Sequence, residues 1–212
     1  MQVVAVILIV ALVVFLAWPA WRNALVKRDL TRTMINGRQL YLATLHMTTD
    51  GAATSDPSLT WPGDSSAASL SEYCATLVER NYLTPSGLQQ ILTAPGADCV
   101  VSSSSTSPVT LSGKSALKVY KAKTADPSNT IFAASSNYVY DTELNPGSVP
   151  FGDAGFVIVR KSGDAGVYKK HQATPAGFES VQKFQTDIGV LPGAAKGRVT
   201  PGDAGTVLSP PL

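Results

Sequence analysis

The sequence predicts an α+β protein in which one long N-terminal α-helix, with an apolar half and an amphipathic half, packs on a small head of short helices and antiparallel β-sheet. Three observations support this fold class. An uncharged apolar run opens the chain, a stripe of apolar residues at helical spacing continues it, and short β-branched or aromatic runs fill the second half. The 212 residues leave room for one ordinary domain. A multidomain enzyme is therefore not expected.

Four segments follow from these patterns. We expect residues 1–21 to form the hydrophobic half of the helix and residues 22–51 its amphipathic half. Residues 52–190 would form the globular α+β head, and residues 191–212 a tail rich in proline and glycine.

The first segment has the composition of a membrane-spanning helix. All 32 charged residues, 17 basic and 15 acidic, lie after residue 21. About 20 apolar residues in a helix span the ~30 Å hydrocarbon core of a bilayer. Trp18 and Trp21 stand where an aromatic belt would lie, just before the first charge at Arg22. The segment lacks the charged start and small-residue cleavage site of a secretory signal, so we expect it to be retained.

The charges and the cysteines predict opposite orientations of the head relative to the membrane. The basic residues that follow the apolar run favour a cytoplasmic head by the positive-inside rule. Cys74 and Cys99, the only cysteines, are 25 positions apart and are typical of a single disulfide in an exported domain. We predict a Cys74–Cys99 disulfide, with two buried free thiols as the alternative.

The second segment is predicted to continue the helix and to pack on the head. Apolar residues recur at Val26, Leu30, Met34, Tyr41 and Leu45. Pro19 can bend a helix without ending it, whereas Gly51 can adopt the left-handed conformation of a helix C-cap. The element would be about 70 Å long, and His46 near its end would interact favourably with the helix dipole.

The head begins with a loop, residues 52–66, and two short helices. Ser69 and Glu72 form a capping-box pattern before an apolar stripe, and Thr84-Pro85 begins a third helix that Pro95-Gly96 ends. Five short runs are predicted to be strands: residues 117–122, 131–134, 138–140, 156–160 and 167–170. Residues 161–166 would form the hairpin turn between the last two strands.

The sequence carries no pattern that indicates catalysis. A net charge of +2 argues against nucleic acid as a partner by charge alone. Gly113-Lys114-Ser115 resembles the end of a phosphate-binding loop, but Pro108 stands where its first glycine is required. His46 and His171 have no further ligands at zinc spacing. We therefore predict no enzyme, no cofactor and no metal.

Three low-complexity features are expected to be loops or turns. Gly-Asp-Ala-Gly occurs at residues 152–155, 163–166 and 202–205, and is typical of tight turns; a calcium loop using Asp153 or Asp164 is the alternative. Residues 102–107, rich in serine, would be a solvated loop, and a site for O-glycosylation if the head is extracellular. The tail cannot fold alone, so we expect it to pack as an extended segment across a subunit boundary.

The first hundred residues resemble the type IV pilin superfamily, which includes the pseudopilins of type II secretion. The resemblance rests on Asn36-Gly37-Arg38-Gln39-Leu40-Tyr41-Leu42-Ala43 followed by Asp50-Gly51, then on Ser71-Glu72-Tyr73 and Ala94-Pro95-Gly96. The family usually has Glu at the fifth mature position, where this chain has Ala5, and its helix-bending proline corresponds to Pro19.

The resemblance implies a structural subunit, a pilin or pseudopilin, that polymerises with copies of itself into a helical filament through its N-terminal helix. It would reside in the inner membrane before assembly and then in an extracellular filament or periplasmic pseudopilus. A monomeric, membrane-anchored extracytoplasmic binding module is the alternative. The filament core would comprise Val3, Val4, Val6, Ile7, Leu8, Val10, Leu12, Val13, Phe15 and Leu16.

Overall fold

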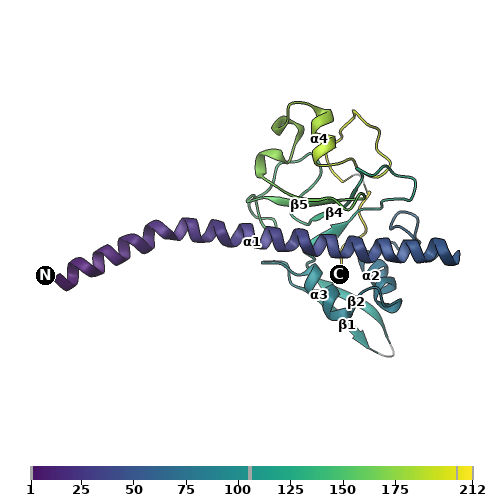
Figure 1. Cartoon of the computed structure of the whole chain (residues 1–212), viewed down its shortest axis with the longest axis horizontal. Helices are drawn as coiled ribbons and strands as arrows, with labels where there is room; N and C mark the ends of the chain where they lie inside the picture. Colours follow the sequence, from purple (N-terminus) through teal and green to yellow (C-terminus); the bar gives the residue numbers. More distant parts are fainter. Residues whose placement is uncertain (1, 105–106, 204, 212) are drawn as a thin grey trace.

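A computed structural model confirms the α+β architecture: one long helix, α1 (Gln2–Thr54), crosses a small head and projects from it at the N-terminal end (Figure 1). The structure describes residues 2–104, 107–203 and 205–211. The side chains of residues 2–14, 16, 17, 19, 20, 104, 107 and 108 are outside this description. Within the described part of the chain, no helix has a stretch long and apolar enough to cross a membrane.

Helix α1 ends later than predicted. It continues through Gly51 to Thr54, and the left-handed residue that follows it is Ser55, with φ 55°. A Cβ on Gly51 would lie 2.1 Å from the carbonyl oxygen of Leu59, so this glycine permits a close backbone approach and does not cap the helix. The capping role predicted for His46 is also wrong, because His46 lies before the last turn.

Two short helices begin at the predicted caps. Helix α2 (Leu70–Glu79) starts after Ser69, whose hydroxyl accepts a hydrogen bond from the Glu72 backbone N–H at 3.2 Å. The Glu72 carboxylate reaches back to the N–H of Ala68, at 2.8 Å. Helix α3 (Pro85–Leu92) has Pro85 in its first turn and Thr84 as its cap.

Four antiparallel strands form the main sheet in the order β3 (Leu117–Val119), β4 (Ile131–Ser135), β5 (Phe156–Arg160) and β6 (Ala165–Tyr168). The predicted β5–β6 hairpin is confirmed, and Gly163 at its turn has φ 85°. The strand predicted at residues 138–140 is wrong. The Tyr140 N–H donates to the carboxylate of Asp203, so it is not part of a strand ladder.

The serine-rich segment is not a loop. It forms a second, two-stranded sheet of β1 (Cys99–Ser104) and β2 (Ser107–Gly113), with residues 105 and 106 outside the description. Cys99, Val109 and Leu111 are buried against the helices, whereas Ser102 and its partner Thr110 are exposed. Exposed serines gave this segment the composition of a loop, so its strand pattern was not recognised in the sequence.

The sequence also gave no indication of helix α4 (Val181–Asp187) or of the 3-10 turns η1 (Lys170–Gln172) and η2 (Pro175–Gly177). Ser180 caps α4 by accepting from the Lys183 N–H at 3.1 Å.

The main sheet separates two apolar cores. Val157 and Val159 of β5 belong to the core shared with α1, α2 and α3, whereas Phe156 and Ile158 belong to a second core that includes Phe184 of α4. The strand alternation therefore places α1 on one face of the sheet and α4 on the other, as Figure 1 shows.

The C-terminal tail docks on its own head. The Leu208 N–H donates to the Val119 carbonyl at 2.9 Å, and the Leu70 N–H donates to the Ser209 carbonyl at 2.9 Å. Leu208 is buried in the core shared with α1. The expectation that the tail packs across a subunit boundary is therefore wrong for this segment.

Candidate assembly surface

The N-terminal part of α1, residues 2–25, forms an arm about 36 Å long that extends beyond the head (Figure 1). Its described side chains are mostly exposed, among them Phe15, Trp18 and Trp21 at 76%, 61% and 68%. Among the side chains of α1 that the structure describes, the first that is buried by the head is Leu30. The arm is thus a helix without intramolecular packing at its described aromatic side chains.

The predicted filament-core residues fall mainly outside the description. Phe15 is the one whose side chain is described, and it is exposed. The backbone of α1 is helical through Pro19, whose side chain lies outside the description. The side chains of the remaining members are likewise outside it: Val3, Val4, Val6, Ile7, Leu8, Val10, Leu12, Val13 and Leu16.

Large apolar side chains also lie on the outer face of α1 where it crosses the head. Ile35 and Leu42 are 50% and 43% exposed, whereas Leu40 is fully buried. Trp21, Ile35 and Leu42 are fourteen and seven positions apart, so they lie on nearly the same line along the helix. Arg28 occupies the intervening position and forms an ion pair with Asp29 at 2.9 Å. Outer-face apolar residues at this spacing are typical of helices that pack against another helix.

Residues 36–43 of α1 have distinct structural roles. Asn36 donates to the Gln90 carbonyl at 3.0 Å, which joins α1 to α3. A Cβ on Gly37 would lie 2.8 Å from Cγ2 of Val159, so the missing side chain lets α1 approach β5 closely. Leu40, Tyr41 and Ala43 are then buried, and Arg38, Gln39 and Leu42 face outward. The motif therefore encodes both the inner contact and the outer surface of α1.

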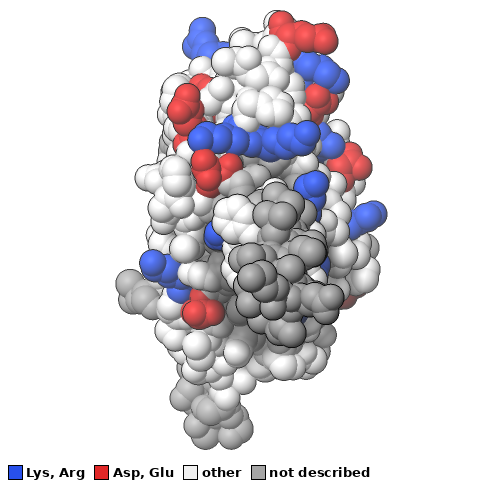
Figure 2. Space-filling view, turned by 90° about the vertical axis from the view of Figure 1, so that its left-hand side faces the viewer, with Lys and Arg blue, Asp and Glu red and all other residues white. Residues whose placement is uncertain are grey.

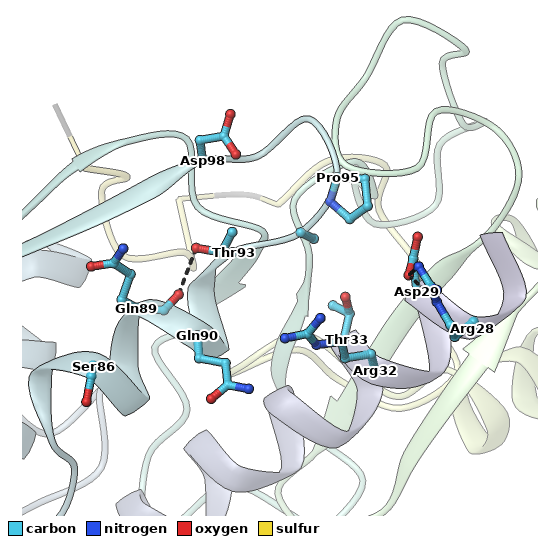
Figure 3. Close-up of a pocket in the computed structure, with 11 residues that line it drawn as sticks. Arg28, Asp29, Arg32, Thr33, Ser86, Gln89, Gln90, Thr93, Pro95 and Asp98 are labelled. Carbon is cyan, nitrogen blue, oxygen red and sulfur yellow. Dashed lines mark hydrogen bonds and ion pairs between the residues drawn. The ribbon is translucent and has the colours of Figure 1, made fainter. Parts of the chain in front are cut away.

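A polar groove of about 600 Å³ runs between α1 and α3, near the base of the arm (Figure 3). Its walls include Arg28, Asp29, Arg32, Gln89 and Asp98. The Arg28 guanidinium donates to Asp29 through Nε and Nη2, at 3.0 and 2.9 Å, so part of this charge is compensated locally. The groove is also lined by amides and hydroxyls, and the Thr93 hydroxyl donates to the Gln89 carbonyl at 2.8 Å.

Charge on the head is mixed. Figure 2, which views the molecule from the side of the arm, shows acidic side chains bordering the basic ones. Lys170 and Asp153 illustrate the mixing, with an ion pair of 2.8 Å. Among the described residues, no group of three or more His, Cys, Asp or Glu side chains could hold a metal ion.

Two of the Gly-Asp-Ala-Gly segments lie at turns, as predicted: residues 152–155 form a turn, and residues 163–166 lead from the turn after β5 into β6. The third, residues 202–205, includes residue 204, which lies outside the description. Gly152, Gly163 and Gly202 have positive φ values of 57°, 85° and 97°. Asp153 pairs with Lys170, and Asp164 accepts from the Ser162 hydroxyl at 2.8 Å. The alternative of a calcium loop gains no support from these contacts. Lys114 and Ser115 lie between β2 and β3, where the helix of a phosphate-binding loop is not present.

Cys74 and Cys99 are free thiols in the structure, and both are buried in the same apolar core. Burial raises the pKa of the Cys74 thiol, and the nearby Cys99 raises it further. Burial also raises the pKa of Cys99. The structure therefore brings the two cysteines near each other, and the disulfide itself stays a prediction.

Comparisons with known proteins add no further information about these surfaces. No family model matches the chain, and no curated protein or solved structure is significantly similar to it.

Proposed function

We propose that the protein is a filament-forming structural subunit, a pilin or pseudopilin, whose α1 helices pack against those of other copies. The single observation that carries this proposal is the line of exposed apolar side chains on α1, Trp21, Ile35 and Leu42, which begins at the end of the uncharged residues 1–21. A monomeric soluble head has no need for a projecting helix with exposed tryptophans.

The energetics favour association through this surface. Burying one large apolar side chain contributes about 1.5–3 kcal/mol. In a helical assembly each copy makes the same contacts with several neighbours. The modest free energy of each contact is therefore summed along the filament. A spacing of seven residues suits packing against a neighbouring helix that crosses α1 at about 20°.

The proposal also assigns a place to the arm before assembly. Residues 1–21 are uncharged and would lie in the inner membrane, with Trp18 and Trp21 at the interface and Arg22 as the first charge outside. On assembly the same residues would move into contact with other arms, in an extracellular filament or a periplasmic pseudopilus.

Charged substitutions on the outer face of α1 test the proposal. Leu42→Asp and Ile35→Asp should abolish fibres in electron micrographs and leave the melting temperature of the head nearly unchanged, because both side chains face outward. Val100→Asp is the matched control, since Val100 is 49% exposed but lies on β1. It should leave fibres intact.

Two outcomes would contradict the proposal. Wild-type fibre yields from Leu42→Asp and Ile35→Asp would exclude this surface from assembly. If the native protein disperses in detergent as single particles without a helical repeat, the alternative of a monomeric anchored binding module is favoured. The polar groove between α1 and α3 is then the place to look for its ligand.

A further inference from the structure

The C-terminal strap, residues 191–203 and 205–211, differs from the rest of the head. Most of residues 193–201 are exposed. Four glycines of the strap, Gly193, Gly197, Gly202 and Gly205, have positive φ values, and nothing lies within 4 Å of where their Cβ atoms would be. The exposed stretch is held mainly by Gln185, whose side chain accepts from the Gly197 N–H at 2.7 Å and donates to the Arg198 carbonyl at 3.0 Å. Leu191 and Leu208 anchor the strap in the two cores on either side of it. Segments with few buried apolar contacts are the ones that open locally.

Its distal end, by contrast, is docked by backbone hydrogen bonds. The Lys121 N–H donates to the Thr206 carbonyl at 2.6 Å, and the Leu208 N–H donates to the Val119 carbonyl. β3 is the first strand of the main sheet, so the strap covers the edge that β4 leaves free. Without it, this edge would present unpaired N–H and C=O groups, which are a template for pairing with another chain.

Asp203 fastens the strap between these two parts. Its carboxylate accepts from Lys118 Nζ at 2.6 Å and from the Tyr120 hydroxyl at 2.7 Å, and also from the Tyr140 N–H at 3.2 Å. Lys118 also donates to the Tyr138 carbonyl. The Lys118 and Asp203 side chains are 13% and 22% exposed, so the pair is largely shielded from solvent.

Losing Asp203 would leave the Lys118 ammonium without its counter-ion. Burial lowers the pKa of Lys118, and the Asp203 carboxylate opposes that shift. A shielded charge that loses its partner is strongly unfavourable. The docking of the strap therefore depends on the carboxylate of Asp203.

We propose that the strap is a releasable cover, latched by Asp203, that opens separately from the rest of the head and then exposes the edge of β3 for pairing with the same edge of a second copy. Two copies of one edge are self-complementary about a two-fold axis when they pair antiparallel. The closed latch keeps heads from associating through this edge. The proposal does not depend on filament formation, because it concerns the head alone.

Amide hydrogen exchange on the full chain in detergent tests the latch. Lys121 and Tyr120 are adjacent on one strand extension, but the Lys121 N–H bonds to the strap and the Tyr120 N–H bonds to Phe132 of β4. Asp203→Asn should accelerate exchange at Lys121 and Leu208 at least tenfold relative to Tyr120. Adding Lys118→Met to Asp203→Asn should restore part of the protection, because it removes the unpaired charge.

The chain supplies a matched control. Asp153 stands in the same Gly-Asp-Ala-Gly context and also pairs with a lysine, but the Lys170 and Asp153 side chains are 54% and 40% exposed. Asp153→Asn should leave exchange at Lys121 unchanged. Chemical cross-linking in detergent should yield dimers with Asp203→Asn and not with Asp153→Asn.

The results that would overturn the proposal are equally specific. Equal exchange rates at Lys121 and Tyr120, in the wild type and in Asp203→Asn, would mean that the strap opens only when the whole head unfolds. Accelerated exchange without cross-linked dimers would overturn the pairing of exposed edges. Failure of fibre formation would bear on neither result.

Discussion

The two halves of helix α1 share a backbone conformation and differ in what surrounds it. From Leu30 onward the helix is held by the sheet and by α3, through contacts such as Asn36 with Gln90 and Gly37 with Val159. Before Val26 the described side chains have no such support. Isolated helices gain little stability in water, so the arm depends on an environment outside its own head. The comparison teaches that one continuous helix can form the core of a domain over one half and stay uncovered by that domain at the described side chains of the other.

Removing the arm would test this division most directly. A chain that begins at Arg22 should fold, remain soluble and melt within a few degrees of the full-length head, because Phe15, Trp18 and Trp21 are exposed. It should form no fibres. Circular dichroism melting and electron microscopy measure the two effects. A truncated chain that is unfolded would show that the arm also stabilises the head.

The two faces of the packed half can be separated by a matched pair. Leu40 and Leu42 are two positions apart, one fully buried and one 43% exposed. Leu40→Ala should lower the free energy of unfolding by about 2–5 kcal/mol, because it leaves a cavity in the core. Leu42→Ala should change it by less than about 0.5 kcal/mol and should weaken fibres instead. Denaturant unfolding measures both, and equal losses would contradict the assignment of faces.

A covalent link would make the head still more independent of the arm. If Cys74 and Cys99 are joined, the closed loop contributes about 3 kcal/mol by restricting the unfolded chain. The unreduced protein should then be two hydrogens lighter than the reduced protein in mass spectrometry. Labelling of both thiols under denaturing, non-reducing conditions would show that no bond forms.

The smallest effect is expected at a helix cap. The short helix α2 depends on local capping more than α1 does, because it has ten residues and α1 has 53. Ser69→Ala removes the hydroxyl that accepts from Glu72 and should cost about 1 kcal/mol. Ser66→Ala, in the preceding loop, is the control and should be neutral. If Ser69→Ala changes the free energy of unfolding by less than the error of the measurement, packing alone stabilises this helix.

Sequence patterns predicted the elements whose signals are local. The apolar spacing of α1, the caps at Ser69 and Thr84 and the β5–β6 hairpin are all encoded by neighbouring residues. The predicted helix end at Gly51 was wrong, because a glycine needed for close approach to Leu59 looks the same in sequence as a glycine at a helix C-cap. Only the tertiary contact distinguishes the two.

The elements that were missed depend on long-range pairing. β1 and β2 are stabilised by each other and by α2 and α3. The serines whose side chains are described, Ser102, Ser103 and Ser112, are exposed. Helix α4 has seven residues and owes its place to Phe184 in the second core. The outer line of α1 could have been found from the spacing of Trp21, Ile35 and Leu42. The face that the head covers was predicted correctly, because Leu30 and Tyr41 are buried in the core and Val26, Met34 and Leu45 pack against it.

The continuity of α1 also has a mechanical consequence. Tension applied to the arm travels along the helix axis straight into the centre of the head, where α1 contacts α2, α3, β4, β5 and β6. Residues 30–54 span about 36 Å, so these contacts are loaded together in shear and do not peel apart one at a time. A head built around the same helix that is pulled therefore resists extraction through its whole core. In the filament that we propose, the weakest link under load would lie at the contacts between copies.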